Sequence, residues 1–432
     1  MERRTFLRTS AFAATAFATR GVFAKTNAND KIGIALIGAR RMGWGDLASA
    51  MTTGEAECVA IADVDTDILQ AKGAEAEKLF GKKPILYSDY RKVLENKDVD
   101  AVIIGTPDHW HCLIFCDACA AGKDVYVEKP IANSMAECDI MVKFAKKYNR
   151  VAAVGQQQDS SQMWDKVIGI ARSGALGKIA RTDVWANFKY GAGAARVPDE
   201  PVPANIDYNM WVGPAPMSPY NKNRFHGLWR VHWNYGGGLM TDWGVHLLDM
   251  AVKGIGKTDF PNKVTALGGR FLYPQNDSQT FDTLNVNYDF GDSSISWSNV
   301  STSNYAPYNM NYGVAFIGER GVLAANREGW ELFPNTETKC IDAPEPQKGK
   351  PTNNEHLAHL KNFIQCIRSR KPETACSIEN GAFCAKLAHM GNISARVGKT
   401  LSYDDNAKTF ADAAADALIK PKYRAPWKFP TI

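Results

Sequence analysis

Two short segments of the chain carry side chains suited to moving a proton on or off a hydroxyl group. Lys129 follows the apolar run DVYV in Glu128-Lys129-Pro130, and Asp242 and His246 lie in GGGLMTDWGVHLLD. Asp242 and His246 are four residues apart, so a helix over this segment would place them on one face. A histidine beside a carboxylate is the pairing of a general base, with Asp242 orienting or charging the imidazole. The same pattern also fits a capping aspartate and a buried structural histidine.

The chain between residues 31 and 155 contains the elements needed to position Lys129. The apolar runs KIGIALIG, ECVAIADVD, DAVIIGTP, DVYVEKP and VAAVG alternate with stretches of helical character. Strands that alternate with helices form βαβ units, and hence a parallel sheet covered on both faces. We therefore predict an α/β fold class, with a doubly wound domain over residues 31–155.

The chain from residue 156 to residue 432 has a different pattern. The strand-like runs TLNVNYDF, SSISWSNV and VAFIGE follow one another with short turns between them, which indicates an antiparallel sheet. Two amphipathic helices are predicted over about 354–370 and 378–397. We expect a substrate-binding α+β domain with a mostly antiparallel sheet, interrupted by an aromatic-rich insertion at about 190–235.

The turn after the first apolar run has the form of a dinucleotide-binding loop. In such a loop the first glycine makes the tight turn, the middle one lets the backbone approach a pyrophosphate, and the last permits close helix packing. Here the loop is degenerate, because Arg40 stands at the middle glycine position. The predicted cofactor-binding residues of this loop are Gly38, Arg40, Arg41, Met42 and Gly43.

Asp63 supports the same interpretation and favours one cofactor. It ends the second apolar run, 20 residues after Gly43. A carboxylate there accepts hydrogen bonds from the adenosine ribose and repels a 2′-phosphate, so we predict NAD rather than NADP. Arg40 or Arg41 would offset this preference by pairing with a phosphate.

Two later loops should meet the cofactor at the carboxyl edge of the predicted sheet, where open α/β folds bind ligands. The first contributes Thr106, Pro107 and His111, although the histidine is equally a helix-start residue without a ligand. The second contributes Glu128 and Lys129. A lysine at this position can reach both a nicotinamide ribose and a substrate hydroxyl.

Cysteines after this loop have a spacing that invites a metal interpretation. His109 is followed by Cys112, Cys116 and Cys119, and the three thiols share one helical face. Cysteine behaves as a small buried hydrophobe, and this face should pack on the sheet. We therefore predict no metal site.

The glycine loop, the acidic residue after the second strand, EKP, and the D-x-x-x-H segment together resemble the Gfo/Idh/MocA family. The resemblance extends over nearly all of the chain after residue 24. It implies a Rossmann domain for residues 31–155 and a catalytic group beside NAD(P) that consists of Lys129, Asp242 and His246. Arg40 and the long insertion depart from the family pattern.

The sugar or polyol that such enzymes oxidise should contact aromatic and polar side chains. Aromatic rings with polar neighbours suit the apolar faces and hydroxyl rims of a pyranose. The predicted substrate-binding residues are Trp185, Arg230, His232, Trp233 and Trp243. The same residue types also enrich packing and subunit interfaces, and we expect a homo-oligomer.

The first 24 residues, MERRTFLRTSAFAATAFATRGVFA, resemble a twin-arginine signal and predict export to the periplasm. The net charge of +5 is mild and no basic run follows, which argues against nucleic acid as a partner. No stretch is long and apolar enough for stable membrane insertion.

We therefore expect an exported oxidoreductase of sugars, glycosides or polyols. His246, assisted by Lys129, would remove a hydroxyl proton while hydride passes to nicotinamide. The cofactor should be tightly held, because no free NAD pool is expected outside the cytoplasm. Two alternatives are an NAD-dependent redox-neutral glycosidase and a non-catalytic sugar or nucleotide sensor on the same fold.

Export gives the first testable prediction. Changing Arg3 and Arg4 together to lysine should retain the protein in the cytoplasm, because the signal depends on paired guanidinium groups rather than on charge alone. Fractionation of cells that express the two forms measures this. Normal export of the double variant would contradict the twin-arginine interpretation.

Overall fold

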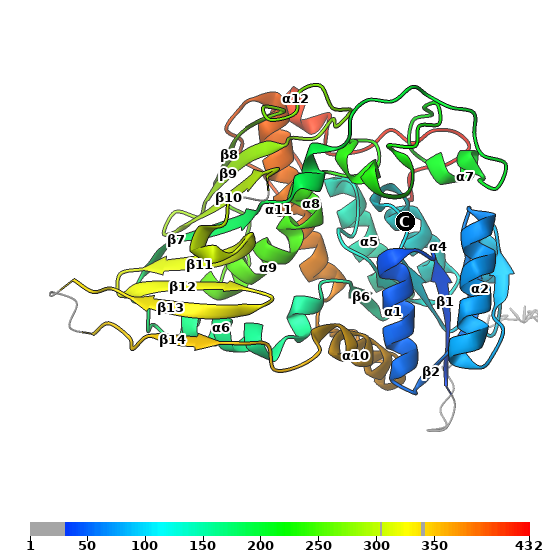
Figure 1. The fold of residues 1–432 in the computed structure, drawn as a ribbon, viewed down its shortest axis with the longest axis horizontal. Helices are drawn as coiled ribbons and strands as arrows, with labels where there is room; N and C mark the ends of the chain where they lie inside the picture. The colour runs from blue at the N-terminus through cyan, green and yellow to red at the C-terminus, as the bar shows by residue number, and fades with distance from the viewer. Residues whose placement is uncertain (1–30, 303–304, 338–341) are drawn as a thin grey trace, which may run out of the picture.

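The computed structural model describes residues 31–302, 305–337 and 342–432. The proposed signal, residues 1–24, lies outside the described residues. The N-terminal and C-terminal domains lie side by side, each built on its own sheet (Figure 1). Within the described ranges, no helix has both the length and the apolar character required to cross a membrane.

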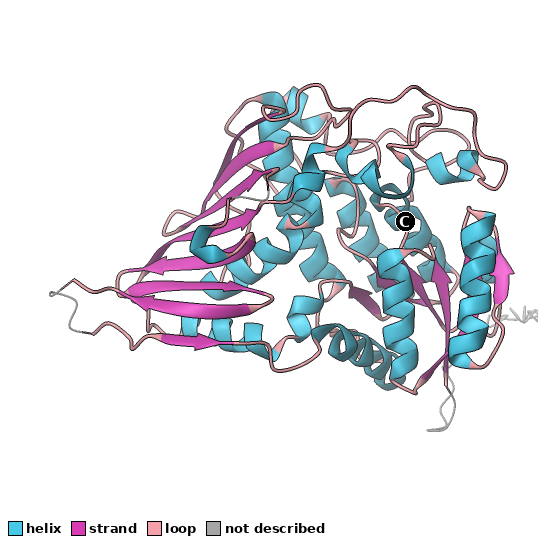
Figure 2. Cartoon of the chain, in the orientation of Figure 1, coloured by secondary structure: helices cyan, strands magenta, loops and turns pink. Residues whose placement is uncertain are grey.

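The N-terminal domain contains a six-stranded parallel sheet with helices around it (Figure 2). Its strands lie in the order β3-β2-β1-β4-β5-β6, the doubly wound Rossmann arrangement that the alternating pattern predicts. They are β1 (Ile32–Ile37), β2 (Ala56–Ala62), β3 (Ile85–Tyr87), β4 (Ala101–Ile104), β5 (Asp124–Val127) and β6 (Ala152–Val154). The apolar-run pattern misses β3, because this short strand has no fully buried side chain.

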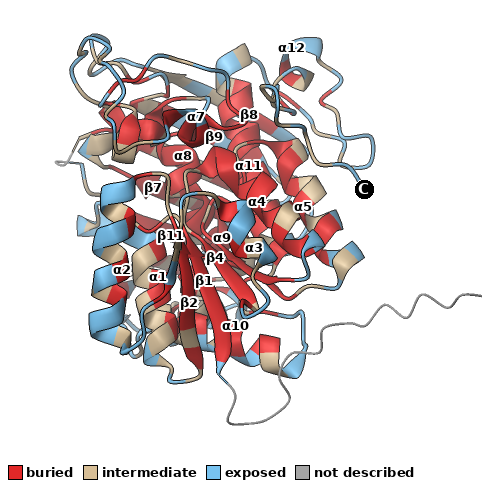
Figure 3. Cartoon of the chain, turned by 90° about the vertical axis from the view of Figure 1, so that its right-hand side faces the viewer, coloured by how far each residue is buried: buried red, intermediate tan, exposed pale blue. Residues whose placement is uncertain are grey.

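The helices of this domain are α1 (Arg41–Thr52), α2 (Thr66–Phe80), α3 (Tyr90–Glu95), α4 (Asp108–Ala120) and α5 (Met135–Tyr148). Every side chain of β1 and β4 is buried, as expected for strands covered on both faces (Figure 3). Cys112, Cys116 and Cys119 of α4 are buried within the apolar core. The prediction that these thiols pack as small apolar groups is confirmed.

The C-terminal domain is built on an eight-stranded sheet. The strands are β7 (Ile179–Ala186), β8 (Lys263–Gly269), β9 (Thr283–Asp289), β10 (Ser294–Val300), β11 (Tyr312–Gly318), β12 (Gly321–Asn326), β13 (Gly329–Pro334) and β14 (Gln347–Gly349). Their order is β14-β13-β12-β11-β7-β10-β9-β8. Strands β7 and β10 pair in parallel and the other neighbours pair antiparallel, which confirms the predicted mostly antiparallel sheet.

Helices pack on the face of this sheet that is turned toward the N-terminal domain (Figure 1). The α-helices of the C-terminal domain are α6 (Gln162–Arg172), α7 (Tyr208–Val212), α8 (Leu239–Asp242), α9 (Gly244–Ile255), α10 (Glu355–Ser369), α11 (Ile378–Val397) and α12 (Ala413–Asp416). The short 3-10 helices are η1 (Gln157–Ser160), η2 (Lys189–Ala192), η3 (Phe225–Val231) and η4 (Pro307–Asn309).

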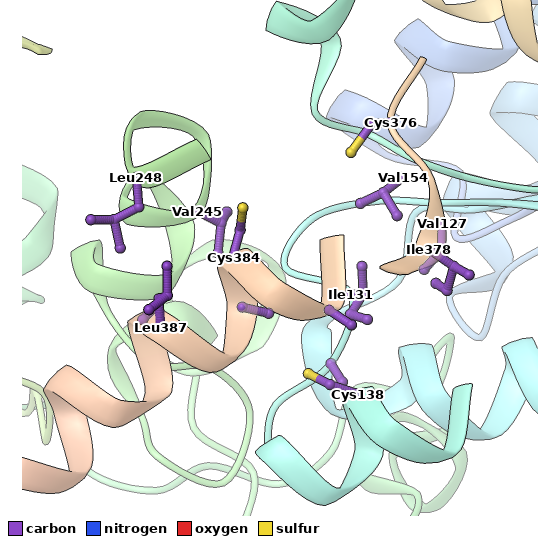
Figure 4. Close-up of a cluster of buried hydrophobic side chains, with 14 of the residues drawn as sticks. Val127, Ile131, Cys138, Val154, Val245, Leu248, Cys376, Ile378, Cys384 and Leu387 are labelled. Carbon is purple, nitrogen blue, oxygen red and sulfur yellow. The ribbon is translucent and has the colours of Figure 1, made fainter. Parts of the chain in front are cut away.

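The two C-terminal helices predicted from sequence are α10 and α11, and both return to the N-terminal domain. Asn354 and Ser377 cap them, each accepting a backbone N–H three residues further on. Helix α10 packs on α1, whereas α11 packs on both α5 and α9. Side chains of α11 lie between those of α9 and those of β5 and β6 (Figure 4), so one apolar core spans both domains.

The aromatic-rich insertion lies above the carboxyl edge of the Rossmann sheet (Figure 1). It has an aromatic cluster of its own, which includes Tyr208, Trp211, Tyr220, Phe225, Trp229 and Tyr235. The indole N–H of Trp110 on α4 donates to the carbonyl of Trp211 at 3.0 Å. The C-terminal tail adds a second anchor, since the Arg424 guanidinium donates to the carbonyl of Gly213 at 3.2 Å.

The packing of α11 gives a stability prediction. A Cβ at Gly381 would lie 2.6 Å from Val154 and 2.8 Å from Ile131. Gly381→Ala should therefore lower the free energy of unfolding by about 1–3 kcal/mol through overpacking. Urea or thermal unfolding measures this.

Gly169→Ala is the matched control, because Gly169 is also helical but has open space around it. It should raise stability by about 0.5–1 kcal/mol. Equal effects of the two substitutions would show that α11 is not closely packed at Gly381.

Candidate active site

The loop between β1 and α1 brings three backbone segments into close contact. Gly38 has a φ of +88°, and a Cβ there would lie 2.8 Å from the backbone of Gly105 and Thr106. A Cβ at Gly43 would lie 2.4 Å from the Gly38 carbonyl oxygen. Gly38 thus makes the tight turn, and Gly43 allows α1 to pack closely against it.

Arg40 is accommodated at the middle position because its backbone is extended, with φ −103° and ψ 160°. It is the N-cap residue of α1, where no side chain caps the helix and no acidic residue occupies the first turn. The free N–H groups and dipole of a helix N-terminus favour an anion. Together with the Arg40 and Arg41 side chains, this donor set fits a pyrophosphate.

Asp63 supports this loop and also faces the cleft beside it. Its Oδ2 accepts a hydrogen bond from the Ala39 N–H at 2.8 Å, and its Oδ1 accepts one from the Asp65 N–H at 3.0 Å. Burial raises the pKa of Asp63 despite these two bonds. A carboxylate at the end of β2 is therefore in place to meet a ribose.

A cleft with an empty volume of about 1040 Å³ opens at the carboxyl edge of the sheet. It brings together the predicted cofactor-binding residues Gly38, Arg40, Arg41, Met42, Asp63, Thr106, Pro107, His111, Glu128 and Lys129. Gly43 does not line the cleft and instead packs beneath it. The donors and the acid of the cleft fit a dinucleotide along its length.

His111 lines the cleft, but its ring nitrogens are engaged with the protein. They lie 2.8 Å from the carbonyl oxygens of Thr106 and Pro130, one on each side of the ring. Burial lowers the pKa of His111 to about 4, so the ring is neutral and donates to one of the two. His111 therefore joins the loops that follow β4 and β5.

The insertion closes the cleft from above. Met210, Trp211, His226, Trp229 and Arg230 all line it. The sequence analysis interpreted this segment as a sugar-binding region. Much of it instead faces the nucleotide-binding loop. The spacing of these residues along the sequence could not reveal this contact.

A hydrogen-bonded contact fastens the insertion to the start of α2. His226 Nε2 lies 2.6 Å from Asp65 Oδ2, and the Asn205 side-chain amide donates to Asp65 Oδ1 at 3.0 Å. Burial opposes ionisation of Asp65, but the hydrogen bonds from His226, the Ile68 N–H and Asn205 together outweigh it and lower the pKa of the acid. The nucleotide cleft is thus enclosed by parts of both domains.

Lys129 and Asp242 meet where this cleft reaches the C-terminal domain. Lys129 Nζ donates to Asp242 Oδ1 and to the Asp242 carbonyl oxygen, both at 2.7 Å. Arg230 Nε donates to the same carboxylate at 3.2 Å, and the Tyr190 hydroxyl donates to its other oxygen. Burial opposes ionisation of Asp242, but the charges of Lys129 and Arg230 together hold its pKa well below the usual range.

The predicted orienting of His246 by Asp242 is wrong, although the charge of Asp242 still acts on the imidazole. Helix α8 ends at Asp242, Trp243 lies between the helices, and α9 begins at Gly244. The hydrogen bonds of the Asp242 carboxylate within the described ranges go to Lys129, Arg230 and Tyr190. Asp242 therefore orients the lysine rather than the histidine, because the helix that would align residues four apart is interrupted.

His246 is buried near this group with a free acceptor. It is 3% exposed, and its Nδ1 has no hydrogen-bond partner in the described part of the chain. Burial, with the nearby charges of Arg327 and Lys129, holds the pKa of His246 well below its usual value. The imidazole is thus neutral at physiological pH and able to accept a proton.

Polar groups that sequence analysis missed surround His246. Arg327 lies over the Trp243 ring at 5.1 Å and donates to Gln158 Oε1 at 3.1 Å. Arg327 Nη2 and Gln158 Nε2 are buried without a partner among the described residues. Buried donors of this kind suit a hydroxylated ligand. They come from the turn after β12 and from η1, and neither segment carries a motif.

The predicted substrate-binding residues are only partly brought together. Arg230 and Trp243 lie beside the catalytic group, whereas Trp185, His232 and Trp233 do not line the cleft. Trp185 packs on Ala315 and Ala324, on the side of β7 opposite to Val184, because side chains alternate along a strand.

His232 and Trp233 do not line the cleft either. His232 is 3% exposed, and neither ring nitrogen has a partner in the described ranges. Trp233 packs against Phe281, with ring centroids 5.5 Å apart, and lies under the Arg396 guanidinium at 4.7 Å. The prediction for Trp185 is therefore wrong, whereas substrate binding by His232 and Trp233 stays a prediction.

Two family models match the chain in the same two parts. Residues 32–156 match the oxidoreductase family's NAD-binding Rossmann fold, and residues 170–429 match the C-terminal alpha/beta domain of the oxidoreductase family. The uncharacterized oxidoreductase YrbE of Bacillus subtilis is 22% identical over 381 residues, which are 86% of this chain and 97% of the relative. A glycosyl hydrolase family 109 protein of Akkermansia muciniphila is 25% identical over 154 residues, 35% of this chain and 32% of the relative.

Solved structures share the whole architecture. A levoglucosan dehydrogenase in complex with NADH and levoglucosan has a TM-score of 0.65 at 19% identity, over 86% of this chain and 99% of its own. An aldose-aldose oxidoreductase from Caulobacter crescentus, complexed with glycerol, has a TM-score of 0.64 at 20% identity, over 86% of this chain and 100% of its own. The N-terminal domain is thus an NAD-binding Rossmann domain.

The contact between His226 and Asp65 gives a prediction for cofactor retention. His226→Ala removes a hydrogen bond to a charged group and weakens the contact of the insertion with the start of α2, where Asn205 still bonds to Asp65. We expect the dissociation constant for NADH to rise roughly 10-fold or more, in line with the loss of about 1.5–3 kcal/mol. Fluorescence titration of the cofactor-free protein measures this.

Lys222→Ala is the control, because its ion pair with Glu200 lies on the exposed surface of the same insertion. Its NADH affinity should equal that of the wild type. An unchanged affinity in the folded His226→Ala variant would show that the insertion does not retain the cofactor.

Proposed function

Because the chain belongs to the Gfo/Idh/MocA family of oxidoreductases, we propose that it transfers hydride between tightly bound NAD and a hydroxyl or keto group of a sugar, glycoside or polyol. The observation that carries the proposal is the position of the Lys129–Asp242 ion pair. Lys129 lines the NAD-binding cleft, whereas Asp242 belongs to the C-terminal domain. A substrate bound between the domains would therefore meet the cofactor at this pair.

The side chains divide the chemistry between them. Bound NAD supplies the hydride acceptor. Lys129, aimed by Asp242, donates a hydrogen bond to the reacting oxygen and stabilises negative charge there. His246, kept neutral by burial, removes the hydroxyl proton, and in the reverse direction its protonated form returns a proton to the carbonyl oxygen.

The substrate class is supported by the groups around His246. Trp243 offers an aromatic face, and Arg327 and Gln158 offer buried donors without partners. Such a combination suits a ring with hydroxyl groups at its rim. Two solved structures with this fold hold polyhydroxylated molecules, levoglucosan and glycerol.

Tight retention of NAD is part of the proposal. The insertion covers the nucleotide cleft and is fastened at Asp65 and at Trp110. The proposal also places the protein in the periplasm after twin-arginine export, on the basis of residues 1–24. A cofactor recycled within its site would make catalysis there independent of a free NAD pool.

The glycosyl hydrolase family 109 relatives favour a second candidate, a redox-neutral glycosidase. In that reaction, transient oxidation of a hydroxyl-bearing carbon acidifies a neighbouring C–H and permits elimination. Lys129 and His246 would perform the same first step. The chain spans about a third of the Akkermansia muciniphila relative, so the dehydrogenase stays the leading proposal.

Nicotinamide absorbance distinguishes the candidates. The NAD-loaded protein is mixed with aldoses, polyols and glycosides, and the reduced-nicotinamide band is followed together with product analysis. A dehydrogenase accumulates the reduced form, whereas a redox-neutral glycosidase shows a transient and releases a sugar. No reduction with any compound would contradict both enzyme proposals and favour a sensor.

Substitution of the two proton-handling residues tests the mechanism. Lys129→Met and His246→Asn should each lower single-turnover nicotinamide reduction by roughly 100-fold or more, because one removes the donor that stabilises the reacting oxygen and the other removes the general base. NAD binding and thermal melts control for cofactor loss and misfolding. Lys361→Met, an exposed lysine on α10, should react at the wild-type rate. A near wild-type rate for His246→Asn would remove the histidine from the mechanism.

A further inference from the structure

A second acidic group lies beside the catalytic lysine and is not used by the mechanism above. Glu128 and Lys129 are adjacent at the end of β5, yet their side chains have different partners. Glu128 lines the cofactor cleft and is 5% exposed. Asp46 of α1 is fully buried behind it, and His356 of α10 lies with its Nε2 2.7 Å from Asp46 Oδ1.

The two carboxyl groups need a proton between them. Asp46 Oδ2 and Glu128 Oε1 are buried, and neither accepts a hydrogen bond from a donor in the described part of the chain. The two carboxyl groups lie within reach of each other, and a hydrogen bond between them requires one to be protonated. Burial, with the charge of Asp46, raises the pKa of Glu128 to about 8. The pair therefore holds a proton at neutral pH.

His356 connects this pair to the surface. Its side chain is 27% exposed, whereas that of Asp46 is 0% exposed. Its Nε2 faces Asp46, and its Nδ1 lies 3.4 Å from the hydroxyl of Ser49. Burial lowers the pKa of His356, so the ring is neutral and able to accept a proton from the acid.

Other charged or titratable groups face Glu128, Asp46 and His356 but already have partners or remain neutral. Lys129 is bonded to Asp242, and Arg327 is bonded to Gln158. The groups that act on the pair and on His356 include Asp108, Tyr126, Lys129, Arg327, Glu355 and His359. His356 thus gives the buried Asp46 a contact that reaches the surface.

We propose that Glu128, Asp46 and His356 form a proton relay between the cofactor cleft and solvent. The proton moves from Glu128 to Asp46 and then to His356 Nε2, while His356 Nδ1 releases a proton to water. The relay rests on the proposed function: the pair gives up its shared proton by this route when NAD is bound, and takes a proton back from water by the same route once hydride transfer has removed the positive charge of the nicotinamide.

The first experiment measures the shared proton without any sugar. Oxidised NAD carries one more positive charge than NADH, so its binding should favour ionisation of a nearby acid pair. Calorimetry of NAD and NADH binding near pH 8, in buffers of different ionisation enthalpy, gives the protons released. We expect a fraction of one proton with NAD and less with NADH. Asp46→Asn and Glu128→Gln should each abolish the difference, and persistence of the wild-type difference in both would overturn the proposal.

The second experiment separates a relay from a static acid pair. Proton release after mixing with NAD is followed with an indicator dye in weakly buffered solution, alongside the protein fluorescence change on binding. His356→Gln should release the same number of protons roughly 10-fold or more slowly, and added imidazole should restore the rate. Lys361→Gln, on the exposed face of α10, is the matched control and should behave as wild type. Release from His356→Gln at the wild-type rate in weak buffer would overturn the relay.

These outcomes are independent of the sugar chemistry. Failure to oxidise any sugar would reject the proposed function but leave proton release on NAD binding intact. Loss of proton coupling with retained sugar oxidation would reject the relay alone. Thermal melts of Asp46→Asn and Glu128→Gln establish that both variants are folded.

Discussion

The ion pair between Lys129 and Asp242 is the interaction on which the proposed site depends, because its partners belong to different domains. Lys129 follows β5, and Asp242 ends α8. Buried charges are costly unless their partners are held in place, and here Arg230 and Tyr190 complete the bonds of the carboxylate. A small shift between the domains would break the ion pair between the lysine and the aspartate. The orientation of Lys129 therefore depends on how closely the two domains pack.

That packing comes from segments late in the chain. Helix α11 places its side chains against α9 on one side and against β5 and β6 on the other, within one continuous apolar core. Helix α10 packs on α1 and brings His356 to Asp46. The tail then reaches the insertion through Arg424. The C-terminal part of the chain thus holds the cleft in shape and also supplies groups that act on it.

Asp242 and Glu128 both lie near Lys129, but their surroundings favour opposite protonation states. Both are buried. For Asp242 the neighbouring cations outweigh burial and keep its pKa low, whereas burial and a second carboxylate raise the pKa of Glu128 to about 8. Separating two acids in this way lets one site hold both a fixed charge and a mobile proton. His246, neutral through burial, adds a base.

The sequence by itself determined the features that follow from local pattern and backbone chemistry. Alternating apolar runs specified the Rossmann sheet, Gly38 and Gly43 marked its first turn, and EKP placed Lys129 at its carboxyl edge. Only the tertiary structure decided which groups meet. Asp242 pairs with Lys129 because α8 ends there. Trp185 lies on the face of the sheet away from the site, because side chains alternate along β7. The insertion faces the nucleotide, and His356 contacts Asp46 across 310 residues, because long-range packing rather than spacing along the chain sets these contacts.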